Sequence, residues 1–312
     1  MLRYALKRLL WLIPVLLGIS VILFIVLQLT PGDAATLLLG QNPDQEVVAK
    51  LREIYGLNDP LHIQYLRLMR NLFTGQLQSI YYKSSVLDQI SQRMPATIEL
   101  GLFAMLIAAA VSLPIGIVAA VKKNTPLDYI GMMLALVGVS VPVFFTGVIL
   151  MYLLSVYWNL LPSSGYGGRI WTASGLRHIL LPGVALSTVL MASTSRLTRS
   201  SMLEVLQSDY VRTAKAKGLA DRVVVLKHAF RNALLPVLTN LGNQLAEVLG
   251  GAVLTETVFS WPGVGRLAVD AVFHRDHPLV FGTVLFLSAI YVITNLIVDL
   301  LYVVVDPRVT YH

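Results

Sequence analysis

The stretch YVRTAKAKGLADRVVVLKHAFRNALLP, residues 210–236, decides the fold, because it is the longest basic, polar segment in a mostly apolar chain. It holds six Lys and Arg residues against one acid, Asp221, and it lies between two long apolar runs. A protein in a bilayer can place such a segment only on a membrane face, since charges inside the hydrocarbon core are costly. We therefore expect this segment to be where the protein meets a soluble partner.

The composition assigns the chain to the membrane proteins. Of its 312 residues, 56% are hydrophobic and only 13% are charged, whereas soluble domains carry about 25% charged residues. The net charge of +7 would suit nucleic-acid binding, but the basic residues lie between apolar runs, as they do in the cytoplasmic loops of membrane proteins. The chain has no cysteine, which excludes a disulfide framework, a thiolate metal site and a cysteine nucleophile.

Six apolar runs predict an all-α membrane protein with six transmembrane helices. At 1.5 Å per residue, each run can cross a hydrocarbon core of about 30 Å. The runs cover residues 9–30, 98–121, 129–157, 178–195, 233–254 and 280–305. Pro142 and Pro182 lie inside the third and fourth runs, where proline frees backbone carbonyls and favours bends. The first run also suits a secretory signal peptide, but its length favours a retained anchor.

The distribution of charge predicts that both termini are cytoplasmic. The termini, residues 122–128 and residues 196–231 together hold fourteen Lys and Arg residues, whereas the short loops of the other side hold four. Residues 31–97 are left out of this comparison, because loops longer than about 60 residues translocate largely regardless of their charge.

The chain divides into three parts. Residues 1–30 form an N-terminal tail and the first transmembrane helix, residues 31–97 a small helical periplasmic insertion, and residues 98–312 a five-helix core. Within the insertion we expect helices over 44–56 and 63–73, the second because its apolar residues share one helix face. The insertion is too short to be an enzyme domain.

Four polar residues mark one face of the fifth apolar run. They are Asn240, Asn243, Gln244 and Glu247. Their spacing of three or four residues places them on one side of a helix. They line a water-filled translocation pathway, or they hydrogen-bond to neighbouring helices and hold the bundle together. The presence of a carboxylate among four polar groups favours the pathway.

No catalytic, metal or cofactor site is predicted in this chain. It lacks a glycine-rich phosphate loop ending in Lys-Ser or Lys-Thr, so it is not expected to hydrolyse ATP by that route. His274 and His277 form an H-x-x-H pattern on the predicted outer face, which we interpret as a solvated loop rather than a metal site. An intramembrane enzyme using Glu99, Asp299 or the histidines is the weaker alternative, because no paired acids are recognisable.

The cytoplasmic segment of about 200–231 is expected to contain two short helices. In SSMLEVLQSDYVRTAKAKG, residues 200–218, Asp209 is a candidate cap for a short helix that Gly218 ends as its C′ residue. A second helix is expected over 221–231. Short helices on a membrane face suit docking into the groove of a partner. A basic helix lying on anionic lipid is the alternative.

This segment resembles the coupling region of permease subunits of bacterial ATP-binding-cassette importers, in the dipeptide, oligopeptide and nickel branch. Members of that branch read similarly to DYVRTAKAKGL followed by HAFRNALLP. The same branch is matched by MLRYALKRLLWLIP, LTPGD, RMPATIEL, TRSSMLEVL, LTETVFSWPGVGR and DLLYVVVDPR. The glutamate of the general family pattern is absent, since Arg212-Thr213-Ala214 stands at its start, and residues 75–86 lack the acidic version usual in the family.

The resemblance implies a type I importer permease fold and a set of partners. These are a second, homologous permease subunit, two ATPase subunits that carry ATP and Mg²⁺, and a periplasmic solute-binding protein, all in the bacterial inner membrane or at its faces. The short helix would lie in a groove of an ATPase subunit. The residues that the resemblance assigns to this coupling are Asp209, Tyr210, Arg212, Thr213, Ala214, Ala216, Lys217 and Gly218.

The solute implied is a dipeptide or oligopeptide. Nickel or a metal chelate, glutathione and opines are alternatives within the branch, and SGYGG at 164–168 together with Glu247 would fit a nickel-type member. Outside the branch, an ion-driven secondary transporter working through Glu247 is the main rival.

Overall fold

The computed structural model of the chain describes residues 2–30, 58–250 and 252–305. Within these ranges every regular element is a helix, and the one β feature is an antiparallel bridge between Gln78 and Ser85. The all-α prediction is therefore confirmed for the described part of the chain.

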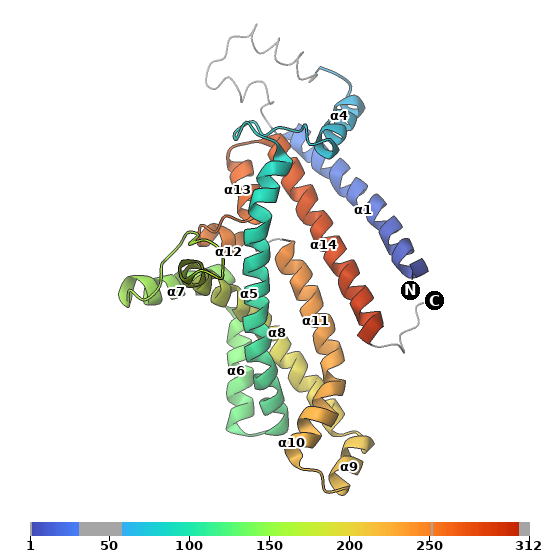
Figure 1. Ribbon diagram of the computed structural model, residues 1–312, viewed down its shortest axis with the longest axis vertical. Helices are drawn as coiled ribbons and strands as arrows, with labels where there is room; N and C mark the ends of the chain where they lie inside the picture. Colours follow the sequence, from blue (N-terminus) through green and yellow to red (C-terminus); the bar gives the residue numbers. More distant parts are fainter. Residues whose placement is uncertain (1, 31–57, 251, 306–312) are drawn as a thin grey trace.

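The helices form a long bundle whose two ends carry different elements. Helix α4 (Leu61–Phe73) lies at one end, and α9 (Asp209–Ala216) and α10 (Asp221–Val223) lie at the other (Figure 1). The helix expected over 63–73 is thus confirmed as α4, whereas the helix expected over 44–56 lies outside the described residues.

Four helices of the described residues are long and apolar enough to cross a bilayer. They are α1 (Leu2–Leu29), α5 (Val86–Val121), α8 (Ala173–Leu206) and α14 (His277–Val305). A fifth span results if α6 (Pro126–Ser140) is joined to α7 (Val143–Leu150) and the π-helix η1 (Met151–Tyr157). The fifth predicted run, residues 233–254, is largely occupied by α11 (Arg231–Leu249), which is not among these helices, so the count of six spans stays a prediction.

The third predicted span is bent by 103° between α6 and α7. Val141 is extended, with φ −90° and ψ 123°, and Pro142 follows it at the start of α7. Proline disfavours the helical conformation of the preceding residue and has no N–H for the helix ladder. The bend expected at Pro142 is confirmed, whereas α8 continues through Pro182 without interruption.

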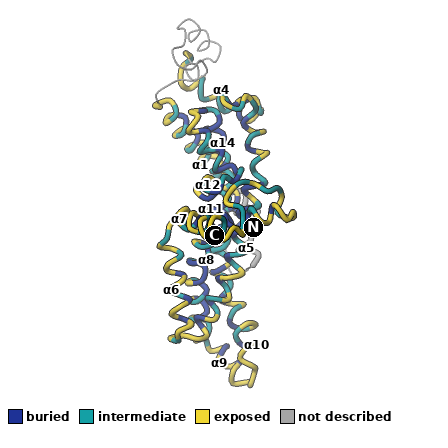
Figure 2. The backbone as a smooth tube through the Cα atoms, turned by 90° about the vertical axis from the view of Figure 1, so that its left-hand side faces the viewer, coloured by how far each residue is buried: buried dark blue, intermediate teal, exposed yellow. Residues whose placement is uncertain are grey.

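Helix α8 is the centre of the bundle, since it packs against α5, α6, α7 and α11. Its contact with α5 is close, because a Cβ added to Gly116 would lie 2.5 Å from the Cβ of Thr198 and 2.8 Å from the carbonyl oxygen of Ser195. Figure 2 shows buried residues along the inside of the bundle and exposed residues along α6 and around α9 and α10. Small and hydroxyl-bearing residues at the contact are typical of helices packed inside membranes.

The second span begins earlier than its apolar run. Helix α5 starts at Val86, whereas the run starts at residue 98, so the insertion gives way to helix before the chain becomes continuously apolar. Val86 and Ile90 are fully buried in a cluster with Leu72 of α4 and Phe281 of α14. This contact stabilises the first turns of α5.

We predict that Gly116→Ala destabilises the protein, because the added methyl group overlaps α8 and overpacking of this kind costs about 1–3 kcal/mol. Gly18→Ala is the matched control, since a Cβ at this glycine of α1 meets nothing within 4 Å. Thermal unfolding in detergent measures both variants. Equal unfolding temperatures for the two would contradict the close contact of α5 and α8.

Candidate coupling and pathway surfaces

The basic segment folds into α9, which follows directly on the end of α8. Ser208, and not Asp209, occupies the N-cap position, with φ −70° and ψ 150°. The sequence-based assignment of Asp209 as the cap is therefore wrong by one residue. Asp209 lies in the first turn instead, where a carboxylate interacts favourably with the helix dipole. Arg212 approaches it at 3.5 Å, and both side chains are largely exposed, so this pair contributes little to stability.

Gly218 ends α9 as predicted. Its φ is +75°, and its N–H donates to the carbonyl of Lys215 at 2.9 Å. This left-handed conformation is open to glycine and costly for branched side chains. Nothing lies within 4 Å of a Cβ placed there, so the constraint is one of backbone conformation and not of space.

Helix α9 has one buried and one exposed face. Val211 and Ala214 are buried against Met202 of α8, Ala120 of α5 and Val224. The other residues assigned to coupling are exposed: Asp209, Tyr210, Arg212, Thr213, Ala216, Lys217 and Gly218. The inner face of α9 is thus fixed to the ends of the transmembrane helices, while its outer face is open to a partner.

The second cytoplasmic helix does not stop at residue 231. It begins as α10, widens into the π-helix η2 (Val224–Phe230) and continues without a break as α11. The expected end at 231 is therefore wrong, because Phe230 and Arg231 keep helical backbone angles. The Asn232 side chain donates from Nδ2 to the Tyr210 hydroxyl at 2.9 Å, which connects α11 to α9.

The four polar residues of α11 separate into two groups. Gln244 is buried, and its amide nitrogen donates to the carbonyl of Leu190 at 3.3 Å and to the Ser193 hydroxyl. The Thr194 hydroxyl donates to Gln244 Oε1 at 3.2 Å and accepts from Asn240 Nδ2 at 3.2 Å. Asn240 and Gln244 therefore hold α11 against α8.

Asn243 and Glu247 lie on an exposed face of α11 in this chain. They are the members of the polar stripe that remain open to a pathway. An exposed carboxylate on a membrane helix requires water or another polar surface nearby, because a charge at the bilayer centre costs about 2.5–3.5 kcal/mol on insertion scales.

A buried carboxylate about half-way along the bundle was missed by the sequence analysis (Figure 1). Glu256 of α12 (Val253–Val258) is fully buried. Its Oε1 accepts from the Thr97 hydroxyl at 2.7 Å, and its Oε2 accepts from the N–H of Arg266 at 2.9 Å. Burial raises the pKa of the Glu256 carboxyl, and these donors partly oppose that shift. The Thr97 hydroxyl also accepts from the N–H of Val264, so one threonine joins α5 to the start of α13 (Val264–Phe273).

The loop before α8 packs on the same region. The N–H of Gly165 donates to the carbonyl of Phe259 at 2.9 Å, and the Tyr166 ring meets the Trp261 ring edge-on at 5.0 Å. Arg169 donates to Glu99 at 2.9 Å, so Glu99 is paired. Burial raises the pKa of Tyr166, and the nearby carboxylate adds to the shift.

The interpretation of the H-x-x-H stretch as a solvated loop is wrong for its central acid. Asp276 is fully buried and accepts from the N–H of Tyr81 at 3.0 Å and from the N–H of Leu279 at 3.1 Å. It thereby joins the 78–85 hairpin to the start of α14. His274 stacks on Tyr81, with ring centroids 3.7 Å apart. Among the described residues no group of three His, Cys, Asp or Glu side chains could hold a metal ion.

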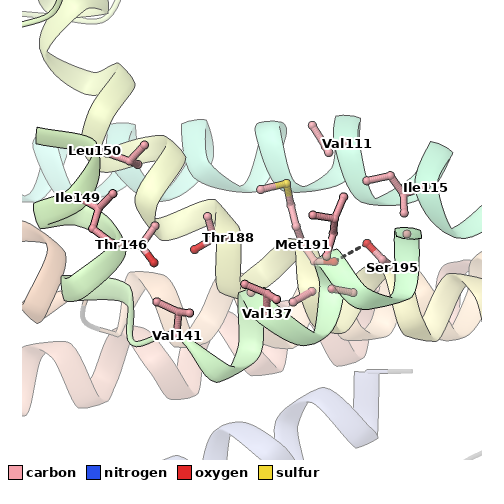
Figure 3. Close-up of a pocket in the computed structure, with 15 residues that line it drawn as sticks. Val111, Ile115, Val137, Val141, Thr146, Ile149, Leu150, Thr188, Met191 and Ser195 are labelled. Atoms are coloured by element: carbon pink, nitrogen blue, oxygen red, sulfur yellow. Dashed lines mark hydrogen bonds between the residues drawn. The ribbon is translucent and has the colours of Figure 1, made fainter. Parts of the chain in front are cut away.

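An apolar cavity of about 440 Å³ lies at the α6–α7 bend, between these helices, α5 and α8 (Figure 3). Its polar groups are the hydroxyls of Thr146, Thr188 and Ser195, and the last donates to the carbonyl of Met191. No charged side chain lines it, so the cavity offers nothing that would bind an ionic solute.

Comparison with known proteins identifies the family. The family described as "Binding-protein-dependent transport system inner membrane component" matches residues 112–311, and its N-terminal counterpart matches residues 1–101. The chain belongs to this family of ABC importer permeases.

Similar permeases match the chain over its full length. The dipeptide transport system permease protein DppB of Alkalihalophilus pseudofirmus is 42% identical, with 100% of both chains covered. DppB of Escherichia coli K12 is 41% identical, with 99% of each covered. The glutathione transport system permease protein GsiC of Salmonella paratyphi A is also 41% identical, with 100% of both chains covered.

Two solved structures share the permease fold. The inward-facing MetNI methionine ABC transporter matches with a TM-score of 0.57 and 15% identity, over 70% of this chain and 97% of that one. An amino acid ABC transporter with histidines matches with a TM-score of 0.52 and 16% identity, over 72% and 95%. The expected type I importer permease fold is confirmed by these matches.

We predict that Thr97→Val destabilises this permease, because it leaves the N–H of Val264 unpaired and removes a donor from Glu256. A buried group left without its partner costs about 1–3 kcal/mol. Thr257→Val is the control, since its exposed hydroxyl bonds only to Val253 within its own helix. Thermal unfolding in detergent compares the two variants. If Thr97→Val lowers the unfolding temperature no more than Thr257→Val does, the Thr97 hydrogen bonds do not stabilise the protein.

Proposed function

We propose that the chain is one of two permease subunits of an ATP-driven importer of dipeptides or oligopeptides. The second subunit is a homologous permease, and two ATPase subunits bind ATP and Mg²⁺ at the cytoplasmic face. A periplasmic binding protein delivers the solute. Full-length relatives named for dipeptides and for glutathione support small peptides as the solute class over nickel.

The observation that carries the proposal is the geometry of α9. Its inner face is packed on α5, α8 and η2, its outer face is bare, and Gly218 fixes its end. A helix that is rigidly joined to the bundle and open on its other side suits docking into a groove of a soluble subunit. This chain then forms half of the pathway and has no enzymatic activity of its own.

The proposed mechanism is alternating access. Closure of the ATPase subunits displaces α9, and the buried contacts of Val211 and Ala214 carry that displacement into α5, α8 and α11. The importer alternates between inward-facing and outward-facing states. ATP shifts this equilibrium because the ATPase subunits bind it more tightly in one of the two states.

The proposed orientation places both termini in the cytoplasm. It is supported by the excess of Lys and Arg in the loops that include α9 and α10. It is also supported by the position of α4, which lies at the end of the bundle opposite these helices (Figure 1). The helical insertion would then meet the binding protein.

We propose that Asn243 and Glu247 line the pathway at the contact with the second permease subunit. Asn240 and Gln244 hold α11 in position from behind, through the Thr194 hydroxyl. A carboxylate in the pathway suits the cationic amino terminus of a peptide.

The test of coupling is Gly218→Val in the reconstituted importer. Valine in a left-handed conformation costs about 1–2 kcal/mol, so α9 ends differently and docks poorly. We expect solute-stimulated ATP hydrolysis and peptide uptake to fall together. Gly218→Asn is the control, because asparagine tolerates this conformation. Normal uptake and stimulation by an assembled Gly218→Val complex would refute the docking role of α9.

For the pathway, Glu247→Gln is expected to lower peptide uptake by a few fold while leaving basal ATP hydrolysis unchanged. The variant removes a charge from the exposed face of α11 and keeps the size of the side chain. Glu204→Gln, at an exposed position near the end of α8, is the control. If the two variants import every tested peptide at the rate of the parent protein, Glu247 has no part in the pathway.

A further inference from the structure

A partly buried ion pair lies outside the surfaces described so far, between a buried carboxylate and an Arg side chain that is 25% exposed. Asp128, in the first turn of α6, is 2% exposed. Arg199 of α8 donates from Nε to its Oδ1 at 2.6 Å and from Nη2 to its Oδ2 at 2.7 Å. The N–H of Asn124, a residue with φ +61°, donates to the same Oδ2 at 3.0 Å. Both carboxylate oxygens are therefore occupied, by α8 and by the α5–α6 turn.

The rest of the contact between α6 and the bundle is narrow and made of small residues. The buried residues of α6 are Asp128, Gly131 and Ala135, while most of its large side chains are exposed. Near its other end, a Cβ on Gly138 would lie 3.0 Å from the carbonyl oxygen of Thr188. Contacts between small apolar residues have little directional preference. A two-pronged Arg–carboxylate pair fixes position and angle.

Stability alone does not account for this pair. A buried ion pair is often no more stabilising than apolar side chains of the same volume. Buried polar groups are known to fix the register of one helix against another. The structure favours that use here, because the pair is a directional contact in a stripe of α6 whose other buried members are Gly131 and Ala135.

The position of the pair connects it to α9. Arg199 lies two turns before the end of α8 at Leu206, about 10 Å along an unbroken helix. Between them, Met202 is fully buried against Val211 and Ala214 of α9. A displacement of α9 therefore reaches Arg199 through continuous helix and packed side chains.

The far end of α6 leads to the other side of the bundle. Beyond the bend at Pro142, α7 packs on α12, where a Cβ on Gly147 would lie 2.9 Å from the Phe259 ring. Phe259 follows α12, the helix that carries the buried Glu256. Helix α6 thus connects the α9 end of the bundle to the Glu256 region.

We propose that Arg199 and Asp128 are positioning residues for coupling, which rests on the function proposed above. Their ion pair makes α6 move with α8 and α9, so that α6 and the direct contact of α8 with α7 together pass the displacement produced by the ATPase subunits to α7 and α12. Without it, α5 and α8 still follow α9, because Gly116 and Thr198 keep those two helices in contact. Helix α6 no longer follows.

The functional test compares Arg199→Gln with Arg196→Gln in the reconstituted importer. Arg196 is exposed on the same helix, three residues earlier, and is the matched control. We expect Arg199→Gln to import about fivefold less peptide per ATP hydrolysed, the lower end of usual coupling energies, with assembly and basal hydrolysis retained. Arg199→Lys keeps the charge but not the two-pronged geometry. It should therefore restore part of the ratio of peptide imported to ATP hydrolysed.

A structural measurement separates positioning from general stability. The chain has no cysteine, so spin labels can be attached at Met133→Cys on α6 and Glu204→Cys near the end of α8, both exposed sites outside α9. In the assembled importer, we expect the label distance to stay narrow and equal with and without ATP. In Arg199→Gln it should broaden or differ between the two states.

The possible results distinguish failure of the proposed function from failure of the positioning role. If the parent importer shows no ATP-dependent uptake, the proposed function fails, while the label distances still report on the α6–α8 connection. If Arg199→Gln matches Arg196→Gln in both the uptake ratio and the distances, the positioning role is wrong. Should Arg199→Gln not assemble, the double variant Asp128→Asn with Arg199→Gln leaves no unpaired charge and is judged by the same two measurements.

Discussion

The close approach of α5 and α8 is the contact on which the rest of the permease depends. Gly116 allows it, since any larger residue would meet the Thr198 side chain and the backbone of Ser195. Once these two helices are fixed, α8 presents its other sides to α6, α7 and α11. Two polar contacts of α8 then hold neighbouring helices, namely Arg199 to α6 and the Thr194 hydroxyl to α11. Lipid tails offer these helices no alternative hydrogen-bond partners, so such polar contacts determine which helices pack against each other.

The features that the sequence predicts well are those with local causes. Apolar runs long enough to cross a bilayer predicted the spanning helices. Pro142 predicted the bend, and Gly218 predicted the end of α9 in a left-handed conformation. Each follows from the backbone chemistry of a few neighbouring residues. Helix boundaries were less accurate. Asp209 stands one place inside α9, and the helix over 221–231 runs on into α11, because packing extends helices beyond their propensity signals.

The features that the sequence did not predict depend on distant partners. Glu256 meets Thr97, and Asp276 meets the backbone at Tyr81, across more than 150 residues of chain. Nothing local indicates that these acids are buried, since an acid in a loop is ordinarily solvated. The polar stripe of α11 shows the same limit. Its spacing placed four residues on one side of a helix, but only the position of α8 separates Asn240 and Gln244, which hold the bundle, from the exposed Asn243 and Glu247.

We propose that this chain receives force from the ATPase subunits at the outer face of α9 and contains no energy source of its own. The most direct measurement is peptide uptake into proteoliposomes that contain this chain, its partner permease and binding protein, with and without the ATPase subunits. The account predicts uptake only when the ATPase subunits and ATP are both present, and none from a proton or sodium gradient. Uptake driven by an ion gradient through this chain without the ATPase subunits would contradict it.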